Sequence, residues 1–143
     1  MKKILVINGP NINLLGLREP EIYGRQSYAD LLEFVDKAAE EAGAGAHCFQ
    51  SNSEGDIVDE IQRAYGKFDG IVINPAAYTH TSIAIPDAIK AVGIPAVEVH
   101  LSDIHKREEY RRISYTSEVC ISTVAGKGFE GYREAIALLM NLT

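Results

Sequence analysis

The sequence has few basic residues, few cysteines and no long apolar run. Lysine and arginine total 14 against 20 aspartates and glutamates, which gives a formal net charge of -6. A nucleic-acid binder needs a dense basic face, and a protein on an anionic membrane needs a basic patch. No apolar run approaches the length that spans a bilayer. We therefore expect neither a nucleic-acid partner nor a membrane partner.

The two cysteines, Cys48 and Cys120, both lie in apolar, strand-like runs. A chain of 143 residues buries roughly two thirds of its unfolded surface, so it needs neither disulfides nor a metal to fold. Buried free thiols are favoured over a disulfide, and they are typical of a reducing compartment. The cysteine usage therefore predicts a cytoplasmic protein.

Short apolar runs alternate with helical patterns along the whole chain. The predicted strands are 3–7, 46–50, 68–74, 96–100 and 119–123. The apolar run of the first strand is too short for a signal peptide. The predicted helices are 27–43, a helix that opens at Ser53 with Asp56, 82–92 and 131–142. This alternation predicts one α/β domain over residues 1–143, with a doubly wound, five-stranded parallel sheet of flavodoxin-like order.

Local signals mark the ends of these predicted helices. Ser27 with Asp30 resembles a capping box, and Gly43 supplies a stop. Pro86 lies near the start of the third helix, where the backbone N–H groups have few partners to lose.

Polar segments follow four of the predicted strands, at the edge of the sheet where ligands bind in such folds. These segments are 8–24, 50–56, 74–82 and 98–111. We expect one crevice lined by their amide, imidazole, guanidinium and phenol groups: Asn11, Asn13, Arg18, Tyr23, Asn52, Asn74, His80 and His100. The far edge of the sheet has no comparable set. Such a lining suits a neutral or anionic polyol better than a hydrophobic ligand.

The first of these segments is long for a connection after a strand, which is typical of a functional lid, and it carries Arg18 and Tyr23. A free tyrosine with a pKa near 10 is only about 0.1% ionised at pH 7, and bringing that pKa to about 7 requires roughly 4 kcal/mol. A guanidinium held close in a water-poor cleft could supply much of this energy. Two interpretations of Tyr23 remain open: an activated base, or a surface tyrosine beside an unrelated arginine. The spacing alone favours the second.

Glu98 and His100 lie on the same side of the predicted fourth strand, because side chains alternate along a strand. The carboxylate can hold the imidazole and favour its protonated form, which would make it a proton donor near neutrality. The pattern fits a structural histidine–glutamate pair equally well.

The sequence does not favour a metal site, a phosphate-binding loop or a Schiff-base lysine. His80, His100 and His105 could cluster, but they lack metal-ligand spacing and no HExxH or cysteine ligand pattern exists, so we expect no metal. No phosphate-binding glycine motif is present. A Schiff-base lysine is poorly supported because no candidate lies within an apolar strand. His47, inside the second strand, is interpreted as structural.

Four segments together resemble the type II 3-dehydroquinate dehydratases, in order and without large gaps from Ile4 to Tyr132: NGPNINLLGLREPEIYG, QSNSEGDIVDEI, INPAAYTHTS and EVHLSDIHKREEYR. Members of that family remove water from 3-dehydroquinate to give 3-dehydroshikimate, a step of the shikimate pathway to aromatic amino acids. The resemblance implies a lyase that works through an enolate, with no Schiff base and no cofactor. The rival interpretation is a flavodoxin-like binding or regulatory module that does no chemistry.

The resemblance also implies catalytic roles. Tyr23 would take a proton from the carbon next to the ketone, and Arg18 would lower the pKa of Tyr23 and steady the transition state. Asn11 would hold the water or oxygen at the enolate. His100, oriented by Glu98, would protonate the departing hydroxyl.

For substrate binding, the resemblance implies that Leu101 and Ser102 offer backbone N–H groups to the substrate carboxylate. The ring hydroxyls would be bound by Asn74, His80 and Arg111. Asp87 would reach the site of a neighbouring subunit, since the family forms trimers that assemble into dodecamers. The sequence departs from the usual pattern at Ser53, Gln62, Pro86 and Asp103, and none of these changes removes a proposed catalytic residue.

Overall fold

The computed structural model describes residues 1–17 and 26–142, so Arg18 and Tyr23 lie outside the described residues. Within the described part of the chain, one parallel sheet has the strand order β2-β1-β3-β4-β5. Its strands are β1 (Lys3–Asn8), β2 (Gly45–Gln50), β3 (Gly70–Asn74), β4 (Ala96–His100) and β5 (Ser122–Ala125). This is the predicted flavodoxin-like order, and the fold class is confirmed.

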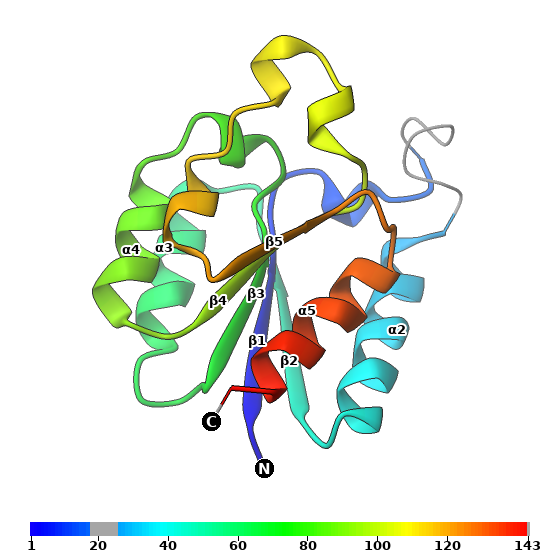
Figure 1. The fold of residues 1–143 in the computed structure, drawn as a ribbon, viewed down its shortest axis with the longest axis vertical. Helices are drawn as coiled ribbons and strands as arrows, with labels where there is room; N and C mark the ends of the chain where they lie inside the picture. The colour runs from blue at the N-terminus through cyan, green and yellow to red at the C-terminus, as the bar shows by residue number, and fades with distance from the viewer. Residues whose placement is uncertain (18–25, 143) are drawn as a thin grey trace.

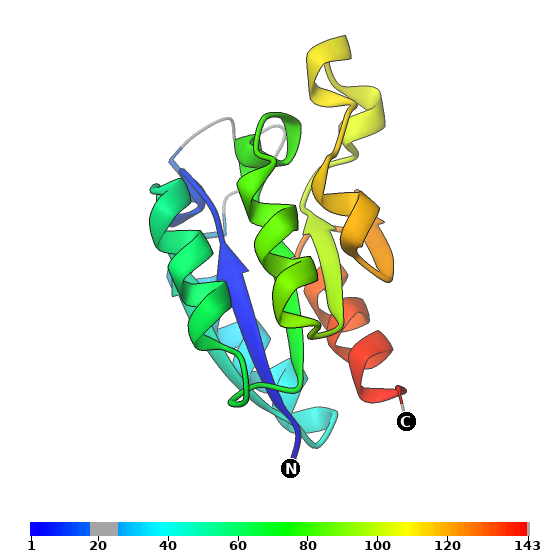
Figure 2. The same ribbon diagram turned by 90° about the vertical axis from the view of Figure 1, so that its left-hand side faces the viewer.

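Two helices cover each face of the sheet. Helices α2 (Tyr28–Glu41) and α5 (Glu130–Met140) pack together on one face, and α3 (Glu54–Arg63) and α4 (Ala84–Val92) pack on the other (Figures 1 and 2). Side chains of β1 alternate between the two cores: Ile4 and Val6 belong to the core under α2 and α5, whereas Leu5 and Ile7 belong to the opposite one. The sheet is therefore buried on both sides, as its apolar sequence predicts.

The predicted local signals are present at the helix ends. The Ser27 hydroxyl accepts from the Asp30 backbone N–H at 3.1 Å, and the Asp30 carboxylate accepts from the Ser27 N–H at 2.9 Å. Ser53 caps α3 by accepting from the Asp56 N–H at 3.2 Å. Gly43 follows α2 with a φ of 78°, a conformation that glycine adopts without strain.

The fifth strand was predicted at 119–123, and this prediction is wrong by about three residues. Strand β5 begins at Ser122, while Thr116–Val119 forms the short 3-10 helix η5, which packs on α4. Val119 and Cys120 are apolar because they cover the core beneath α4, not because they enter the sheet. Apolar character alone does not separate these two environments.

Both cysteines are free thiols, as predicted, but they are only half-buried. Cys48 lies on β2, whereas Cys120 precedes β5 and is not on a strand. Burial, with a smaller contribution from nearby carboxylates, raises the pKa of each thiol to about 12, so both stay protonated. No helix in the described residues is long and apolar enough to cross a membrane.

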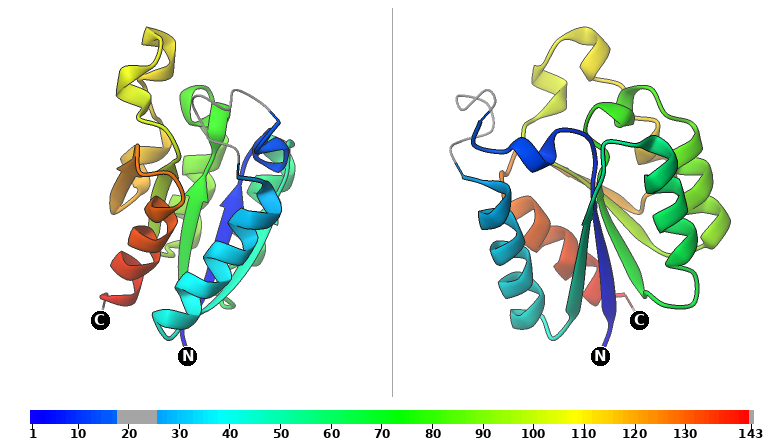
Figure 3. Two further views of the ribbon diagram at one scale, coloured as in Figure 1. Left: turned by 90° about the vertical axis from the view of Figure 1, so that its right-hand side faces the viewer. Right: turned by 180° about the vertical axis from the view of Figure 1, so that it is seen from behind.

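Short helices crowd the carboxyl ends of the strands. They are η1 (Ile12–Leu14), η2 (Ala76–His80), η3 (Ile104–Lys106) and η4 (Glu109–Arg111). The segment between β4 and η5 rises beyond the end of the sheet, and the turns after β1 and β3 lie beside it (Figures 1 and 3). These segments surround the predicted site.

Candidate functional site

A pocket of about 120 Å³ lies at the carboxyl ends of β1, β3 and β4. This is next to the β1–β3 switch point, where ligands bind in flavodoxin-like sheets. The structure brings together seven of the predicted site residues in its lining: Asn11, Asn74, His80, His100, Leu101, Ser102 and Arg111. The pocket lining also includes Arg107, which sequence reasoning missed.

The other predicted residues lie elsewhere. Glu98 does not line the pocket but is fully buried behind His100. Asp87 is exposed on α4 and is not part of the lining of this single chain. Asn13 and Asn52 were expected in the crevice wall, and this is wrong: Asn13 accepts a hydrogen bond from the Gln50 amide at 3.2 Å, and neither side chain lines the pocket.

Asn52 instead shapes the loop that carries Asn11. Its Oδ1 accepts from the Asn11 backbone N–H at 3.0 Å. Asn11 has a φ of 70°, in the left-handed region that asparagine tolerates better than most residues. Glycine is needed at position 9, two residues earlier, since a Cβ on Gly9 would lie 2.5 Å from the Pro75 carbonyl oxygen. The close approach of the loops after β1 and β3 therefore fixes the position of Asn11.

His100 and Glu98 form a buried pair. The Nε2 atom of His100 contacts Oε2 of Glu98, and both side chains are almost inaccessible to solvent. A carboxylate only accepts hydrogen bonds, so Nε2 carries the hydrogen and Nδ1 is the nitrogen left for a ligand in the pocket. The predicted same-side placement on β4 is correct, and it gives His100 a fixed orientation.

Two hydroxyl groups also bind the Glu98 carboxylate. Thr79 on η2 donates to Oε2 at 2.8 Å, and Ser114 lies 2.7 Å from the same oxygen and 3.0 Å from Oε1. Burial raises the pKa of Glu98, but the hydrogen bond and charge of His100, together with these hydroxyls, lower it below its ordinary value. Glu98 is therefore an anion at neutral pH, and its carboxylate holds the His100 ring through Nε2.

Replacing Ser114 by alanine is expected to lower the free energy of unfolding at pH 7 by about 1.5 to 3 kcal/mol, the usual value of a hydrogen bond to a charged group. The low folded-state pKa of Glu98 stabilises the fold above the ordinary carboxyl pKa, and this stability is lost as the pH falls through the folded-state value. Without the Ser114 hydroxyl the pKa of Glu98 rises, so the loss begins at higher pH. Urea unfolding of Ser114→Ala and of the wild type between pH 3 and 8 measures this pH dependence of the free energy of unfolding.

Ser117→Ala is the matched control, because its hydroxyl donates to the Ser114 carbonyl at 2.8 Å and not to Glu98. It should change stability by a similar amount at every pH. An equally flat difference for Ser114→Ala would mean that Ser114 does not stabilise the carboxylate.

His80 is placed to bind and not to ionise. Its Nδ1 donates to the Ile113 carbonyl at 2.7 Å, which leaves Nε2 free for a ligand. Burial, with the nearby positive charges of His100 and Arg111, lowers the pKa of His80 against the opposing effects of Ile113 and Glu98. The imidazole is therefore neutral at pH 7 and suits a hydrogen bond to a hydroxyl group.

Two arginines bring positive charge to the pocket. Arg107 donates to the Ser102 hydroxyl at 3.3 Å, and Arg111 pairs with Glu108 at 3.1 Å. Leu101 and Ser102 follow β4 directly in the same wall. This side of the pocket therefore suits an anionic ligand. Among the described residues, no group of three or more histidine, cysteine, aspartate or glutamate side chains could hold a metal ion.

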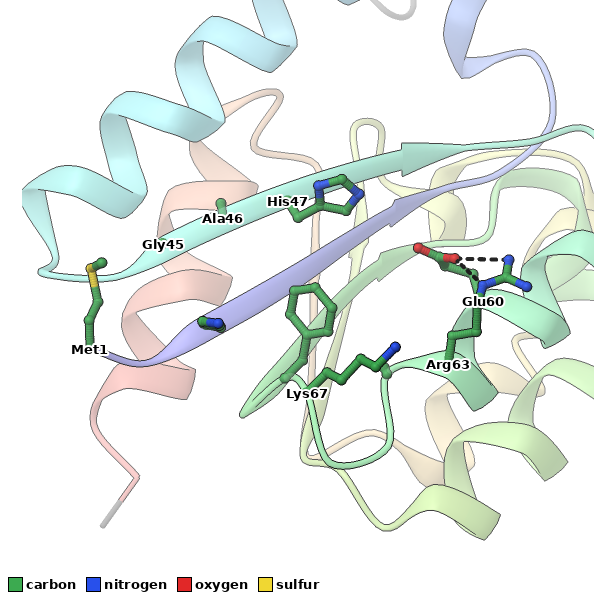
Figure 4. Close-up of a pocket in the computed structure, with 10 residues that line it drawn as sticks. Met1, Gly45, Ala46, His47, Glu60, Arg63 and Lys67 are labelled. Carbon is green, nitrogen blue, oxygen red and sulfur yellow. Dashed lines mark hydrogen bonds and ion pairs between the residues drawn. The ribbon is translucent and has the colours of Figure 1, made fainter.

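A larger hollow of about 440 Å³ lies at the opposite end of the sheet, against β2 and the end of α3 (Figure 4). The exposed His47 lines this hollow. The carboxylate in the lining, Glu60, forms an ion pair with Arg63 at 3.0 Å. No buried imidazole–carboxylate pair faces this hollow among its lining residues. The smaller pocket, with His100 held by Glu98, is therefore the candidate active site.

Comparisons with known proteins identify the family of this chain. A family model described as dehydroquinase class II matches residues 2–140. A 3-dehydroquinate dehydratase of Clostridium acetobutylicum is 57% identical over 140 residues, which cover 98% of this chain and 97% of that protein.

Solved structures give the same family. A type II dehydroquinase from Butyrivibrio crossotus is similar with a TM-score of 0.94 and 49% identity, covering 96% of this chain and 97% of that one. A type II dehydroquinase from Propionibacterium acnes is similar with a TM-score of 0.95 and 40% identity, covering 99% of this chain and 98% of that one. Because the family model and these relatives span nearly the whole sequence, the chain belongs to the class II dehydroquinases.

Proposed function

We propose that this protein catalyses the dehydration of 3-dehydroquinate to 3-dehydroshikimate through an enolate, with no Schiff base and no cofactor. The observation that carries the proposal is the buried His100–Glu98 pair, in which His100 lines a polar pocket and uses only Nε2 for its contact with Glu98. A proton donor fixed in this way is what the departure of a hydroxyl group requires. Membership of the class II dehydroquinases supplies the substrate.

The proposed reaction begins at carbon. Tyr23, activated by Arg18, takes a proton from the carbon next to the ketone, and the C–H electron pair becomes an enolate. Asn11 stabilises the enolate oxygen through a water or directly. The enolate then returns to the ketone while the C–O bond to the leaving hydroxyl breaks, and His100 donates the proton with which that hydroxyl leaves as water.

The walls of the pocket hold the substrate during this reaction. The backbone N–H groups of Leu101 and Ser102 bind the carboxylate, a role that the nearby Arg107 supports. Asn74, His80 and Arg111 bind the ring hydroxyls. Donors fixed by the fold cost little reorganisation when the enolate forms, which is the general advantage of a preorganised site.

Incubation with 3-dehydroquinate tests this function directly. Dehydration creates a double bond conjugated with the ketone, so an ultraviolet absorbance should grow at micromolar enzyme. The absence of any signal would favour the rival function, a binding or regulatory module that has the crevice but no chemistry.

Borohydride separates the enolate route from an imine route. We expect the protein to remain active after treatment with borohydride in the presence of substrate, because no imine forms that could be reduced. Mass spectrometry of the treated protein should show the unmodified chain. A substrate-sized adduct on a lysine, with loss of activity, would contradict the enolate proposal.

The resemblance also leads us to propose a cytoplasmic dodecamer built of trimers. The exposed position of Asp87 on α4 leaves this carboxylate available to a neighbouring subunit. The free thiols of Cys48 and Cys120 fit a reducing compartment. Light scattering measures the assembly, and a monomeric mass would contradict it.

A further inference from the structure

A buried polar cluster lies behind the pocket, between the sheet and α5. Asn8 and Asn74 end the neighbouring strands β1 and β3 and are paired in register. Tyr132 on α5 is fully buried between them, although 124 residues separate it from Asn8 in the chain. The Tyr132 hydroxyl lies 2.6 Å from Oδ1 of Asn8 and 3.0 Å from Nδ2 of Asn74.

The hydrogen-bond chemistry of this cluster fixes the orientation of the Asn74 amide. A tyrosine hydroxyl has one hydrogen, and here it donates that hydrogen to the Asn8 oxygen. It must therefore accept from Asn74, whose nitrogen faces Tyr132 while its oxygen accepts from the Ala76 N–H at 3.1 Å. A flipped amide would place Nδ2 against the Ala76 donor. Asn74 is left with one N–H and one lone pair for a ligand.

The Ala76 contact is itself unusual. Ala76 has a φ of 52°, in the left-handed region, where alanine is rare and the backbone is strained. This conformation turns the Ala76 N–H back toward Asn74 at the rim of the pocket. The amide is therefore held from two sides, by a side chain of α5 and by the backbone of the loop after β3.

Stability alone does not account for the cluster. The Asn8 Nδ2 atom is buried without a partner at hydrogen-bond distance among the described residues, and the only other polar group that the Asn8 side chain influences there is the Tyr28 hydroxyl, whose pKa it lowers against the larger effect of burial. An incompletely satisfied polar cluster is less stable than apolar side chains that fill the same volume. Burial raises the pKa of Tyr132 far above its ordinary value, so the hydroxyl keeps its hydrogen at every pH at which the enzyme would work.

We propose that Tyr132 is a positioning residue that acts through Asn74. Its hydroxyl, anchored on Asn8, holds the Asn74 amide in the single orientation that offers one donor and one acceptor to a hydroxyl of the substrate. Tyr132 itself does not line the pocket. The inference rests on the proposed function, because it concerns the binding of that substrate.

The variant Tyr132→Phe tests this role, since it removes one oxygen and keeps the ring. In this variant only the Ala76 N–H still holds the Asn74 amide, which is then less firmly oriented. We therefore expect KM for 3-dehydroquinate to rise about tenfold while kcat changes much less, because the contact to a ring hydroxyl is made in both the ground state and the transition state. The matched control is Leu139→Ala on the same helix, buried near Gly70 at the other end of the sheet. It should lower the melting temperature at least as much and leave KM unchanged.

A double variant decides whether Tyr132 acts through Asn74. Asn74→Ala alone should raise KM, and adding Tyr132→Phe should raise it no further, because the residue that Tyr132 orients is gone. A KM effect that multiplies in the double variant, or an unchanged KM in Tyr132→Phe, would overturn the inference while leaving the proposed function intact. If Tyr132→Phe does not fold, Asn8→Ala takes its place, with the same expected direction and the same double variant. A wild-type protein inactive on 3-dehydroquinate would overturn the proposed function and this inference together.

Discussion

Replacing His100 by alanine is expected to lower kcat by about a thousandfold, within the usual range for loss of a general acid or base. His100 is the pocket-lining imidazole whose Nε2 contacts a buried carboxylate, so Nδ1 is left for the substrate. Without it the leaving hydroxyl must depart as hydroxide or take a proton from water. The loss should appear in kcat and in kcat/KM alike, because proton donation occurs only in the transition state.

Steady-state kinetics of His100→Ala, followed by the product absorbance, make the measurement, and His105→Ala is the control. His105 is exposed on η3 only five residues away, so its removal should leave kcat unchanged. A His100→Ala enzyme with kcat within tenfold of wild type would mean that another group, or water, supplies the proton.

The order of the sheet was predictable because it depends on simple periodicities. Runs of apolar residues, helical patterns and caps such as Ser27 with Asp30 are local signals, and each is present in the structure. The predicted position of the fifth strand was wrong because Val119 and Cys120 are partly buried by packing on the α4 side of the sheet. A sequence shows that a residue is apolar but not which neighbour buries it.

The site was predictable where it lies on a strand and less so in the loops. His100 and Glu98 follow the alternation of β4, and Asn74 ends β3, so their positions follow from the strand register. Asn13 and Asn52 lie in the expected loops, but loop side chains have no period that predicts their direction. Asn52 binds the Asn11 backbone and Asn13 binds the Gln50 amide, and neither side chain lines the pocket.

The groups that orient the site residues could not be found from spacing. Thr79 and Ser114 are 19 and 16 residues from the carboxylate that they hold. Tyr132 lies within the predicted helix 131–142, and a tyrosine that such a helix buries needs a partner for its hydroxyl. Only the folded chain shows that the partners are Asn8 and Asn74.

Tyr23→Phe is expected to lower kcat by about three to four orders of magnitude, because it deletes the proposed base and nothing else. The described part of the pocket offers few other groups that could act as the base. Of its lining residues, only His80 and His100 could accept a proton from carbon. His100 is placed to donate, and His80 hydrogen-bonds the Ile113 carbonyl beside the proposed hydroxyl contacts. Tyr23, to which the family resemblance assigns the role of base, is therefore the first residue to replace.

Tyr65→Phe is the control for this variant, because Tyr65 is an exposed tyrosine just after α3 and contributes nothing to the pocket lining. It should leave kcat unchanged. Exchange of the substrate proton into deuterated solvent gives a second measurement, since Tyr23→Phe should stop this exchange, whereas His100→Ala should slow turnover and still allow it. If Tyr23→Phe exchanged the proton at the wild-type rate, the base would have to be a different residue, and His80, whose lowered pKa keeps it neutral and able to accept a proton, would be the next to replace.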